Sequence, residues 1–378
     1  MARIRLGMVG GGNDAFIGGV HRIAARIDDR YELVAGALSS TPEKSAASAK
    51  ALGIPRSYAS FAEMAEAEAA REDGIEAVSI VTPNHVHAAA AKAFLARGIH
   101  VICDKPLTST MDDAEALEKA VAESDALFVL THNYTGYPMI RQARAMIQAG
   151  DLGEIRIVQA EYPQDWLTSP METEGLKQAE WRTDPKRSGA GGCVGDIGTH
   201  AHNLACFVTG LTVEKLAADL QAFGTGRTLD DNAHVMLRFV GGARGMLWSS
   251  QVAPGNENAL KLRVYGDKGG LEWRQEDPNY LWFTPHGEPK RLITRGGSGA
   301  NDAASAVSRI PSGHPEGYLE GFATIYNEAA DAIRAVQNGA DRAQAMGVLP
   351  GIVEGMSGMS FINACVSSSS ADAIWVNL

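Results

Sequence analysis

The stretch "IRLGMVGGGNDAFIGG", residues 4–19, places a cluster of glycines directly after a short apolar run. A strand, a glycine turn and a helix begin a dinucleotide-binding unit, in which backbone N–H groups at the helix N-terminus approach a pyrophosphate. The usual spacing is G-x-G-x-x-G, and Gly10 and Gly12 are followed here either by Ala15 or, after an insertion, by Gly18. In the second register Gly18 stands where the helix packs against the strand. We therefore predict a phosphate-binding turn whose contacts depend on the register.

The residues up to 131 alternate short apolar runs with helical patterns. The runs cover residues 4–9, 33–38, 77–81, 100–103 and 127–130, and helical patterns such as 41–52 and 87–98 lie between them. Buried strands that alternate with helices of this length are typical of a parallel sheet covered on both faces. We predict an α/β Rossmann domain over residues 1–131.

After residue 131 the pattern changes to alternating, half-buried strands at residues 153–162, 233–239, 243–253, 260–266 and 270–275. Short turns with Gly-Gly or Asp-Lys-Gly separate several of them, which indicates a mainly antiparallel, open-faced sheet. Helices are expected at 318–338 and 342–366, a long surface loop at 296–313 and a loose connection at 367–370. We predict an α+β substrate and oligomerisation domain over 132–345, then a C-terminal helix and tail over 346–378.

Composition excludes several classes of protein. The chain has 378 residues and a formal net charge of −11, so we expect no nucleic-acid partner. No apolar run reaches the ~18 residues of a membrane span. Because strand-like sequence begins at Ile4, we expect no signal peptide. The four cysteines form no CxxC pair, so we expect reduced, buried thiols in a cytoplasmic protein.

The end of the second apolar run should read the ribose of the cofactor. An acid there would bind both ribose hydroxyls and repel a 2′-phosphate. The sequence instead has Ser39 and Ser40, with Lys44 nearby. Small hydroxyls accept either cofactor and the lysine favours a phosphate, so these residues do not decide between NAD and NADP. We expect NAD as the cofactor and leave NADP open.

Two further stretches lie where apolar runs end, at the carboxyl edge of the predicted sheet. In open α/β sheets, ligands bind at this edge. In "VTPNHVH", residues 81–87, the alternative is a Pro-Asn turn that caps a helix. His85 and His87 would point in different directions on that helix, so we expect no metal site. In "CDKPL", residues 103–107, Lys105 lies at the cofactor crevice, or else in an ordinary loop before a proline.

The segment 191–210 is expected to be helical and to carry a possible acid–base pair. Asp196 and His200 are four residues apart and share one face. A carboxylate and an imidazole together suit general acid–base chemistry near neutral pH. The alternative is a buried pair with a structural role only.

Together these motifs resemble the Gfo/Idh/MocA oxidoreductases, the family of glucose–fructose oxidoreductase and inositol dehydrogenases. The likeness covers nearly the whole chain, and it lies in the glycine turn, Thr82-Pro83-Asn84-His85-x-His87, Lys105-Pro106 and Gly191-Gly192-x-x-x-Asp196-x-Gly198-x-His200. It implies that Lys105, Asp196 and His200 are catalytic. Asp104 replaces the family's usual glutamate, and the step from Gly18 to His21 favours the register with the insertion. The predicted cofactor-binding residues are Gly10, Gly12, Asn13, Ala15, Phe16, Ile17, Ser39, Ser40, Thr82, Pro83, Asn84, His87, Asp104, Lys105, Pro106, Asn133, Gln164 and Trp166.

The resemblance also implies a substrate class. "YPQDW", residues 162–166, is similar to the Gln-Asp-Trp of levoglucosan dehydrogenase-like members and suggests a sugar or cyclic polyol. The family's open-faced sheet implies a dimer or tetramer. Rival hypotheses are a glycosidase with an internal NAD redox cycle and a dinucleotide sensor without catalysis. Besides Lys105, Asp196 and His200, the candidate substrate contacts are Trp166, Arg182 and His314, with Asp231 and Asn232 as further hydroxyl contacts; each of these five could instead be a surface-loop residue.

Overall fold

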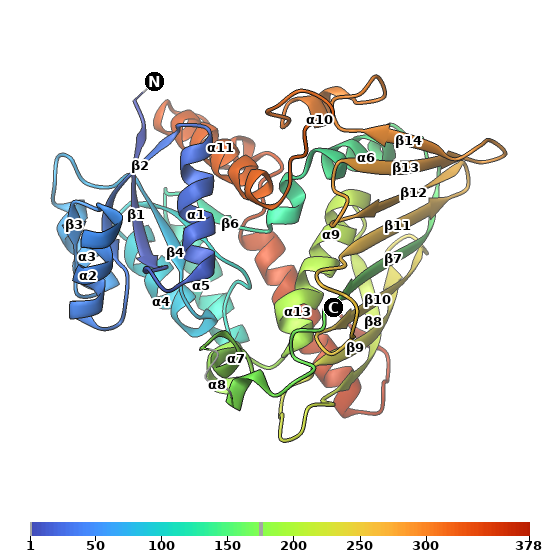
Figure 1. Cartoon of the computed structure of the whole chain (residues 1–378), viewed down its shortest axis with the longest axis horizontal. Coiled ribbons are helices and arrows are strands. Elements are labelled where there is room, and N and C mark those ends of the chain that lie inside the picture. The colour runs from blue at the N-terminus through green and yellow to red at the C-terminus, as the bar shows by residue number, and fades with distance from the viewer. Residues whose placement is uncertain (1, 174–176) are drawn as a thin grey trace. The chain divides into compact units, whose positions relative to one another are not determined.

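The computed structural model describes residues 2–173 and 177–378. Two compact units are present: residues 2–133 with Leu319–Ser357, and Tyr134–Tyr318 with Gly358–Leu378 (Figure 1). The sequence placed residues 319–345 in the second domain, whereas here Leu319–Ser357, with nearly all of α11 (Tyr318–Gln337), belongs to the first unit. The His21 ring lies 5.0 Å from the ring of Phe322 and 5.8 Å from that of Tyr326.

The first unit contains a six-stranded parallel sheet, which confirms the Rossmann prediction. The strand order is β3-β2-β1-β4-β5-β6. The short strand β3 was not predicted, because two residues carry no periodicity. The strands are β1 (Ile4–Gly10), β2 (Tyr31–Ala37), β3 (Arg56–Ser57), β4 (Ala77–Val81), β5 (His100–Cys103) and β6 (Phe128–Leu130).

The helices of this unit begin and end at residues suited to those positions. Pro42 occupies the first turn of α2, and the side chains of Ser60 and Thr110 accept hydrogen bonds at the N-termini of α3 and α5. Gly53 ends α2 in the left-handed conformation, with φ 67°. The helices are α1 (Phe16–Ile27), α2 (Pro42–Leu52), α3 (Phe61–Ala69), α4 (Asn84–Leu95), α5 (Met111–Glu123), α11 and α12 (Arg342–Met346).

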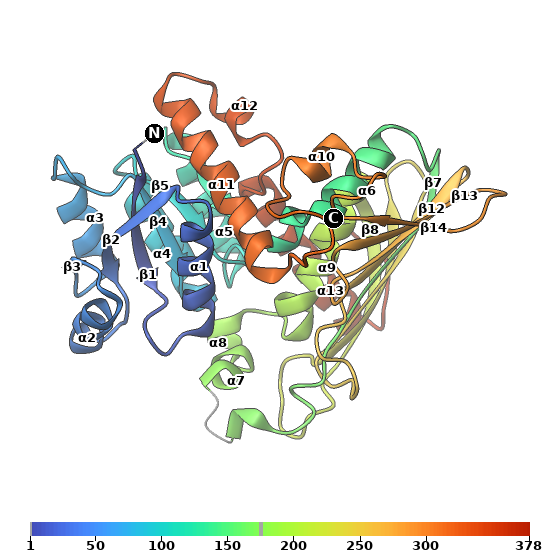
Figure 2. The same ribbon diagram turned by 45° about the horizontal axis from the view of Figure 1, so that its top comes forward.

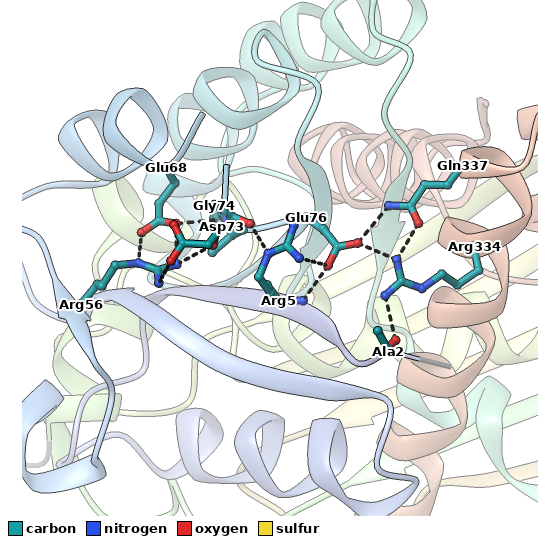
Figure 3. Close-up of polar contacts among 10 residues, drawn as sticks. Ala2, Arg5, Arg56, Glu68, Asp73, Gly74, Glu76, Arg334 and Gln337 are labelled. Carbon is teal, nitrogen blue, oxygen red and sulfur yellow. Dashed lines mark hydrogen bonds and ion pairs between the residues drawn. The ribbon is translucent and has the colours of Figure 1, made fainter. Parts of the chain in front are cut away.

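Two glutamates organise a polar network in this unit (Figure 3). Glu76 accepts hydrogen bonds from the backbone N–H of Arg5 and from the side chains of Arg334 and Gln337. Glu68, whose side chain is fully buried, accepts two hydrogen bonds from Arg56, at 2.6 and 2.7 Å. Burial of Glu68 opposes ionisation, but hydrogen bonds from Arg56 and Tyr58 outweigh it and hold the pKa of this carboxyl below its usual value.

We expect Glu68→Gln to lower the free energy of unfolding by about 2 kcal/mol, because the Arg56 guanidinium loses its buried anionic partner. Urea unfolding at neutral pH measures the change. Asp73→Asn is the matched control: Asp73 also pairs with Arg56, but its side chain is 62% exposed, so its loss should cost at most about 1 kcal/mol. Equal losses from the two variants would contradict a buried ion pair as the cause.

The second unit contains a nine-stranded, mostly antiparallel sheet, as expected. The order is β14-β13-β12-β11-β7-β10-β9-β8-β15, and β7 pairs with β10 in parallel. The strands β8, β13, β14 and β15 were not predicted. The strands are β7 (Ile155–Pro163), β8 (Val213–Gln221), β9 (Asn232–Phe239), β10 (Arg244–Ser250), β11 (Lys261–Gly266), β12 (Gly269–Arg274), β13 (Tyr280–Pro285), β14 (Arg291–Thr294) and β15 (Val376–Asn377).

The two faces of this sheet differ in composition. The buried Val158 and Leu247 lie on one face, which α6 (Pro138–Gln148) and α9 (Thr199–Thr209) cover (Figure 2). Met236 and Met246, paired across β9 and β10, lie on the other and are 53% and 46% exposed. The alternation matches the open-faced sheet predicted from the sequence.

Three predictions about the helices need correction. The helix expected at 342–366 is interrupted, because α12 ends at Gly347 (φ 53°) and Pro350 precedes α13 (Ile352–Ser370). Residues 367–370 are not a loose connection but the last turn of α13, and the hydroxyl of Ser368 accepts a hydrogen bond from the backbone of Ala218. The loop expected at 296–313 contains the short helix α10 (Asp302–Ser305), capped by Asn301.

Candidate active site

The glycine turn after β1 is shaped for a close approach. Gly10 has φ +74°, and a Cβ there would lie 2.3 Å from the carbonyl oxygen of Val81. A Cβ on Gly18 would lie 2.4 Å from the carbonyl oxygen of Gly11, so Gly18 makes the close contact between helix α1 and the turn. The structure therefore favours the register with the insertion over the one that ends at Ala15.

Helix α1 begins at this turn with its N-terminal amides available. Ala15 at the N-cap contributes no side-chain hydrogen bond, and the N–H groups of the first turn of a helix have no intrahelical acceptor. Asn13 and Phe16 beside them are exposed. A glycine cradle that a Cβ would fill, next to a helix N-terminus, fits the pyrophosphate of a dinucleotide.

The end of β2 carries hydroxyls rather than an acid. The Ser39 hydroxyl accepts a hydrogen bond of 3.2 Å from the backbone N–H of Thr41, and Ser40 is exposed. The backbone N–H of Leu38 donates to the hydroxyl of Ser45 at 2.9 Å. The end of β2 is therefore followed by hydroxyls that can hydrogen-bond to a ribose.

His87 connects the loops that follow β4 and β5. Its Nδ1 lies 2.9 Å from the carbonyl oxygen of Pro106 and its Nε2 2.9 Å from that of Thr82. Burial lowers the pKa of His87, and a neutral ring can donate only one of these two bonds. His85 is exposed, so the two histidines point in different directions. The part of the chain that the structure describes contains no cluster of His, Cys, Asp and Glu side chains suited to a metal ion.

Lys105 is the second residue after β5 and is half-buried. Its backbone N–H donates to Asp104 at 2.9 Å, and the Thr131 hydroxyl donates to the same carboxylate oxygen at 3.1 Å. Among the buried polar atoms of this unit that have no hydrogen-bond partner in the described residues are Oγ1 of Thr82 and Nδ2 of Asn133. Orphaned polar atoms on the loops after β4 and β6 are consistent with polar contacts to a cofactor at this sheet edge.

In the second unit the predicted helix 191–210 divides into a π-helical turn, Val194–Gly198, and the α-helix α9. Asp196 lies in the turn, and one of its carboxylate oxygens accepts hydrogen bonds from Nε of Arg182 at 3.1 Å and from Nε2 of Gln251 at 2.9 Å. His200 is buried in α9, with its ring 4.9 Å from the ring of Tyr134 in an edge-to-face arrangement. The turn and the helix therefore carry a carboxylate and an imidazole in defined positions.

Polar side chains beside His200 form a continuous chain of hydrogen bonds. The hydroxyls of Tyr134 and Tyr162 lie 2.5 Å apart, and Tyr162 donates to Asn258 at 2.8 Å. Asn258 also accepts from Gln164 at 2.7 Å, and the indole of Trp166 donates to Gln164 at 3.1 Å. Burial raises the pKa of both tyrosines, so their hydroxyls stay protonated at neutral pH. These hydrogen bonds hold Trp166 in place through Gln164, the first residue after β7.

The other predicted substrate contacts have different surroundings. Arg182 lies beside Asp196, as described above. Asp231 is buried and accepts hydrogen bonds from the backbone of Phe223 and Gly224, and Asn232 accepts one from Trp248 at 3.0 Å. His314 lies in an exposed loop, and the side chain of Arg295 donates a hydrogen bond to the backbone carbonyl oxygen of His314. The side chain of Asp231 is therefore used to hold a turn.

Gln251, Tyr134 and Asn258 were not identified from the sequence. Tyr134 follows the last strand of the first unit, and no spacing links it to His200. Gln251 and Asn258 reach their partners across 55 and 94 residues of chain. The four cysteines are free thiols, of which Cys103, Cys193 and Cys365 are buried as expected and Cys206 is half-buried.

Comparison with known proteins identifies the family. The model of the oxidoreductase family with an NAD-binding Rossmann fold matches residues 4–132, and the model of the GFO/IDH/MocA C-terminal domain matches residues 140–272. The chain belongs to the Gfo/Idh/MocA oxidoreductase family. Its first unit thus carries the family's NAD-binding fold, and the resemblance inferred from the motifs is confirmed.

Proteins similar to this Gfo/Idh/MocA chain include solved structures. An oxidoreductase from Sinorhizobium meliloti is 64% identical, with a TM-score of 0.89 and complete coverage of both chains. An inositol dehydrogenase homolog from Azotobacter vinelandii, complexed with NADH and myo-inositol, is 36% identical, with a TM-score of 0.93 over 100% of this chain and 98% of the other. Levoglucosan dehydrogenase from Pseudarthrobacter phenanthrenivorans is 26% identical over 100% of this chain and 99% of its own. In the described residues, no helix is both long and apolar enough to cross a membrane.

Proposed function

We propose that this Gfo/Idh/MocA protein is an NAD-dependent dehydrogenase that oxidises a secondary hydroxyl of a sugar or cyclic polyol. The observation that carries the proposal is the segment Val194–Thr209, which bears Asp196 with two hydrogen-bond donors and His200 packed against tyrosines. The relatives named for inositol and levoglucosan support the substrate class.

In this proposal each residue has a separate role. NAD, when bound, supplies the acceptor for the hydride that leaves the carbinol carbon. His200 takes the hydroxyl proton on an imidazole nitrogen. Nζ of Lys105 donates a hydrogen bond to the same oxygen and stabilises the negative charge that develops there. Asp196, held by Arg182 and Gln251, orients the substrate.

The test uses purified protein with NAD or NADP and a panel of inositols, aldoses and glycosides, and follows the absorbance of reduced nicotinamide. A rate with one polyol class supports the proposal, and the preferred cofactor answers the question left open by Ser39 and Ser40. Release of free sugar from a glycoside without net cofactor reduction would show a glycosidase instead. Cofactor binding with no turnover on the panel and no glycoside cleavage would favour a sensor.

We also propose a homo-oligomer, a dimer or tetramer, in the cytoplasm. The outer face of the second sheet supports this, because Met236, Met246 and Ile157 are exposed there at 53%, 46% and 46%. Light scattering after size exclusion gives the mass in solution. A monomer at micromolar concentration would contradict the proposal.

A further inference from the structure

Three consecutive backbone N–H groups at the start of the Asp196–His200 segment donate to one residue, Asp230. The N–H of Gly192 donates to Oδ1 at 2.6 Å and that of Val194 to Oδ2 at 2.7 Å. The N–H of Cys193 donates to the backbone carbonyl oxygen of Asp230 at 2.7 Å. Both oxygens of one carboxylate and one carbonyl thus hold the chain immediately before Asp196.

The fit between these two segments is close. A Cβ on Gly192 would lie 2.2 Å from the carbonyl oxygen of Asp230 and 2.9 Å from Cβ of Leu229. Real Cβ atoms do not approach so closely, so a side chain at position 192 would push the two segments apart. The contact with Asp230 therefore explains the second glycine of the Gly191-Gly192 pair.

The contact with Asp230 lies directly before the turn that carries Asp196, so it affects where the proposed catalytic residues lie. The π-helical turn begins at Val194, and the first N–H groups of a helical segment need partners from outside. Asp230 supplies them, while the N–H of Asp196 is bound to the carbonyl oxygen of Gly192 at 2.9 Å. A displacement at Gly192 would therefore be passed to Asp196 and, through the continuing helix, to His200.

We propose that Asp230 is a positioning residue: its carboxylate fixes the start of the segment that carries Asp196 and His200. The inference rests on the proposed dehydrogenase function, in which both residues act on the substrate. Asp230 precedes β9 and the neighbouring strand β10 leads to Gln251, whose backbone N–H donates to Asp231 at 2.8 Å and whose side chain binds Asp196. Adjacent strands thus hold the segment at Gly192–Val194 and at Asp196.

The ionised form of Asp230 is the one that best fits two N–H donors, since protonation turns one of its oxygens into a hydroxyl, which is a poorer acceptor. Burial raises the pKa of Asp230 to about 6, although its backbone hydrogen bonds lower it. Among the described residues, the groups that interact electrostatically with it include Asp231, Cys193 and Cys365. Burial raises the pKa of both thiols, so they stay neutral, and Asp231 is paired with Arg227. Below about pH 6 the hydrogen bonds from Gly192 and Val194 to the Asp230 carboxyl are therefore weakened.

The test compares Asp230→Asn with wild type. The amide keeps one acceptor and turns an N–H₂ toward the other backbone donor, so we expect kcat to fall roughly 10- to 100-fold, with the Kd for NADH unchanged. Toward acid pH, kcat should fall more steeply in wild type than in the variant, because the variant has no carboxyl to protonate at position 230. Asp219→Asn, at an exposed carboxylate on β8, is the control that should keep wild-type kcat.

A second readout does not depend on turnover. Hydrogen exchange followed by mass spectrometry should become faster across residues 192–200 in Asp230→Asn, and unchanged in Asp219→Asn. Exchange and kcat like those of wild type would overturn the role of Asp230 and leave the dehydrogenase proposal intact. A wild-type protein without turnover on any polyol would instead contradict the proposed function. Even then, hydrogen exchange in Asp230→Asn equal to that of wild type would overturn the positioning role of Asp230.

Discussion

Replacing Lys105 with methionine should lower kcat about 1,000-fold while the Kd for NADH changes little. The substitution keeps the length and much of the apolar stem of the side chain but removes its charged donor. Loss of one hydrogen-bond donor to a developing oxyanion costs about 10²- to 10³-fold in rate. The cofactor turn, formed by Gly10, Gly12 and Gly18, is built from backbone and does not involve this side chain. Steady-state kinetics and fluorescence titration with NADH separate the two effects.

Two further variants make the Lys105 experiment specific. Lys50→Met changes an exposed lysine on α2 and should behave as wild type. Lys105→Arg keeps the charge but alters the donor geometry, so part of the rate should return. Turnover of Lys105→Met within threefold of wild type would remove Lys105 from the mechanism. Loss of NADH binding in the same variant would assign the lysine mainly to the cofactor.

The first sheet was largely predictable because its strands are buried on both faces. The runs at β1, β4 and β5 are mostly apolar and almost wholly buried, and such runs can be recognised without knowledge of their partners. One of the strands that were missed depends on distant pairing: β15 consists of Val376–Asn377 and pairs with β8, far earlier in the chain. A two-residue strand has no pattern of its own; β15 is held by its pairing with β8, and just before it the Ser368 hydroxyl of α13 donates to the carbonyl oxygen of Ile374.

The residues of the candidate site are also of two kinds, those in a local sequence motif and those defined by contacts with distant segments. Lys105, Asp196 and His200 belong to short motifs, and residue type with spacing was enough to nominate them. Gln251 and Asp230 act through hydrogen bonds to segments 55 and 36 residues away, and glutamine and aspartate are common residues outside any motif. The sequence did hold one indirect indication. A glycine pair directly before a helical pattern requires a close neighbour, but it does not say which residue that neighbour is.

Replacing His200 with glutamine should lower kcat by about 10²- to 10⁴-fold, which is the usual contribution of a general base. Glutamine has a similar size and can still hydrogen-bond, so the packing against Tyr134 should be mostly kept. Because no side chain then takes the hydroxyl proton, the remaining rate should rise with pH as hydroxide in solution replaces the base. Kinetics from pH 6 to pH 10 measure both effects.

His202 provides the comparison that separates catalysis from packing. It lies on the same helix, and its ring stacks on Phe361 at 4.4 Å. Burial lowers its pKa to about 4, so it is neutral at the pH of the assay. We expect His202→Gln to lower the melting temperature while kcat stays within a few-fold, the opposite of the pattern expected for His200→Gln. If both variants lose stability and activity in parallel, α9 serves only as a packing element at these positions, and the proton acceptor must lie elsewhere.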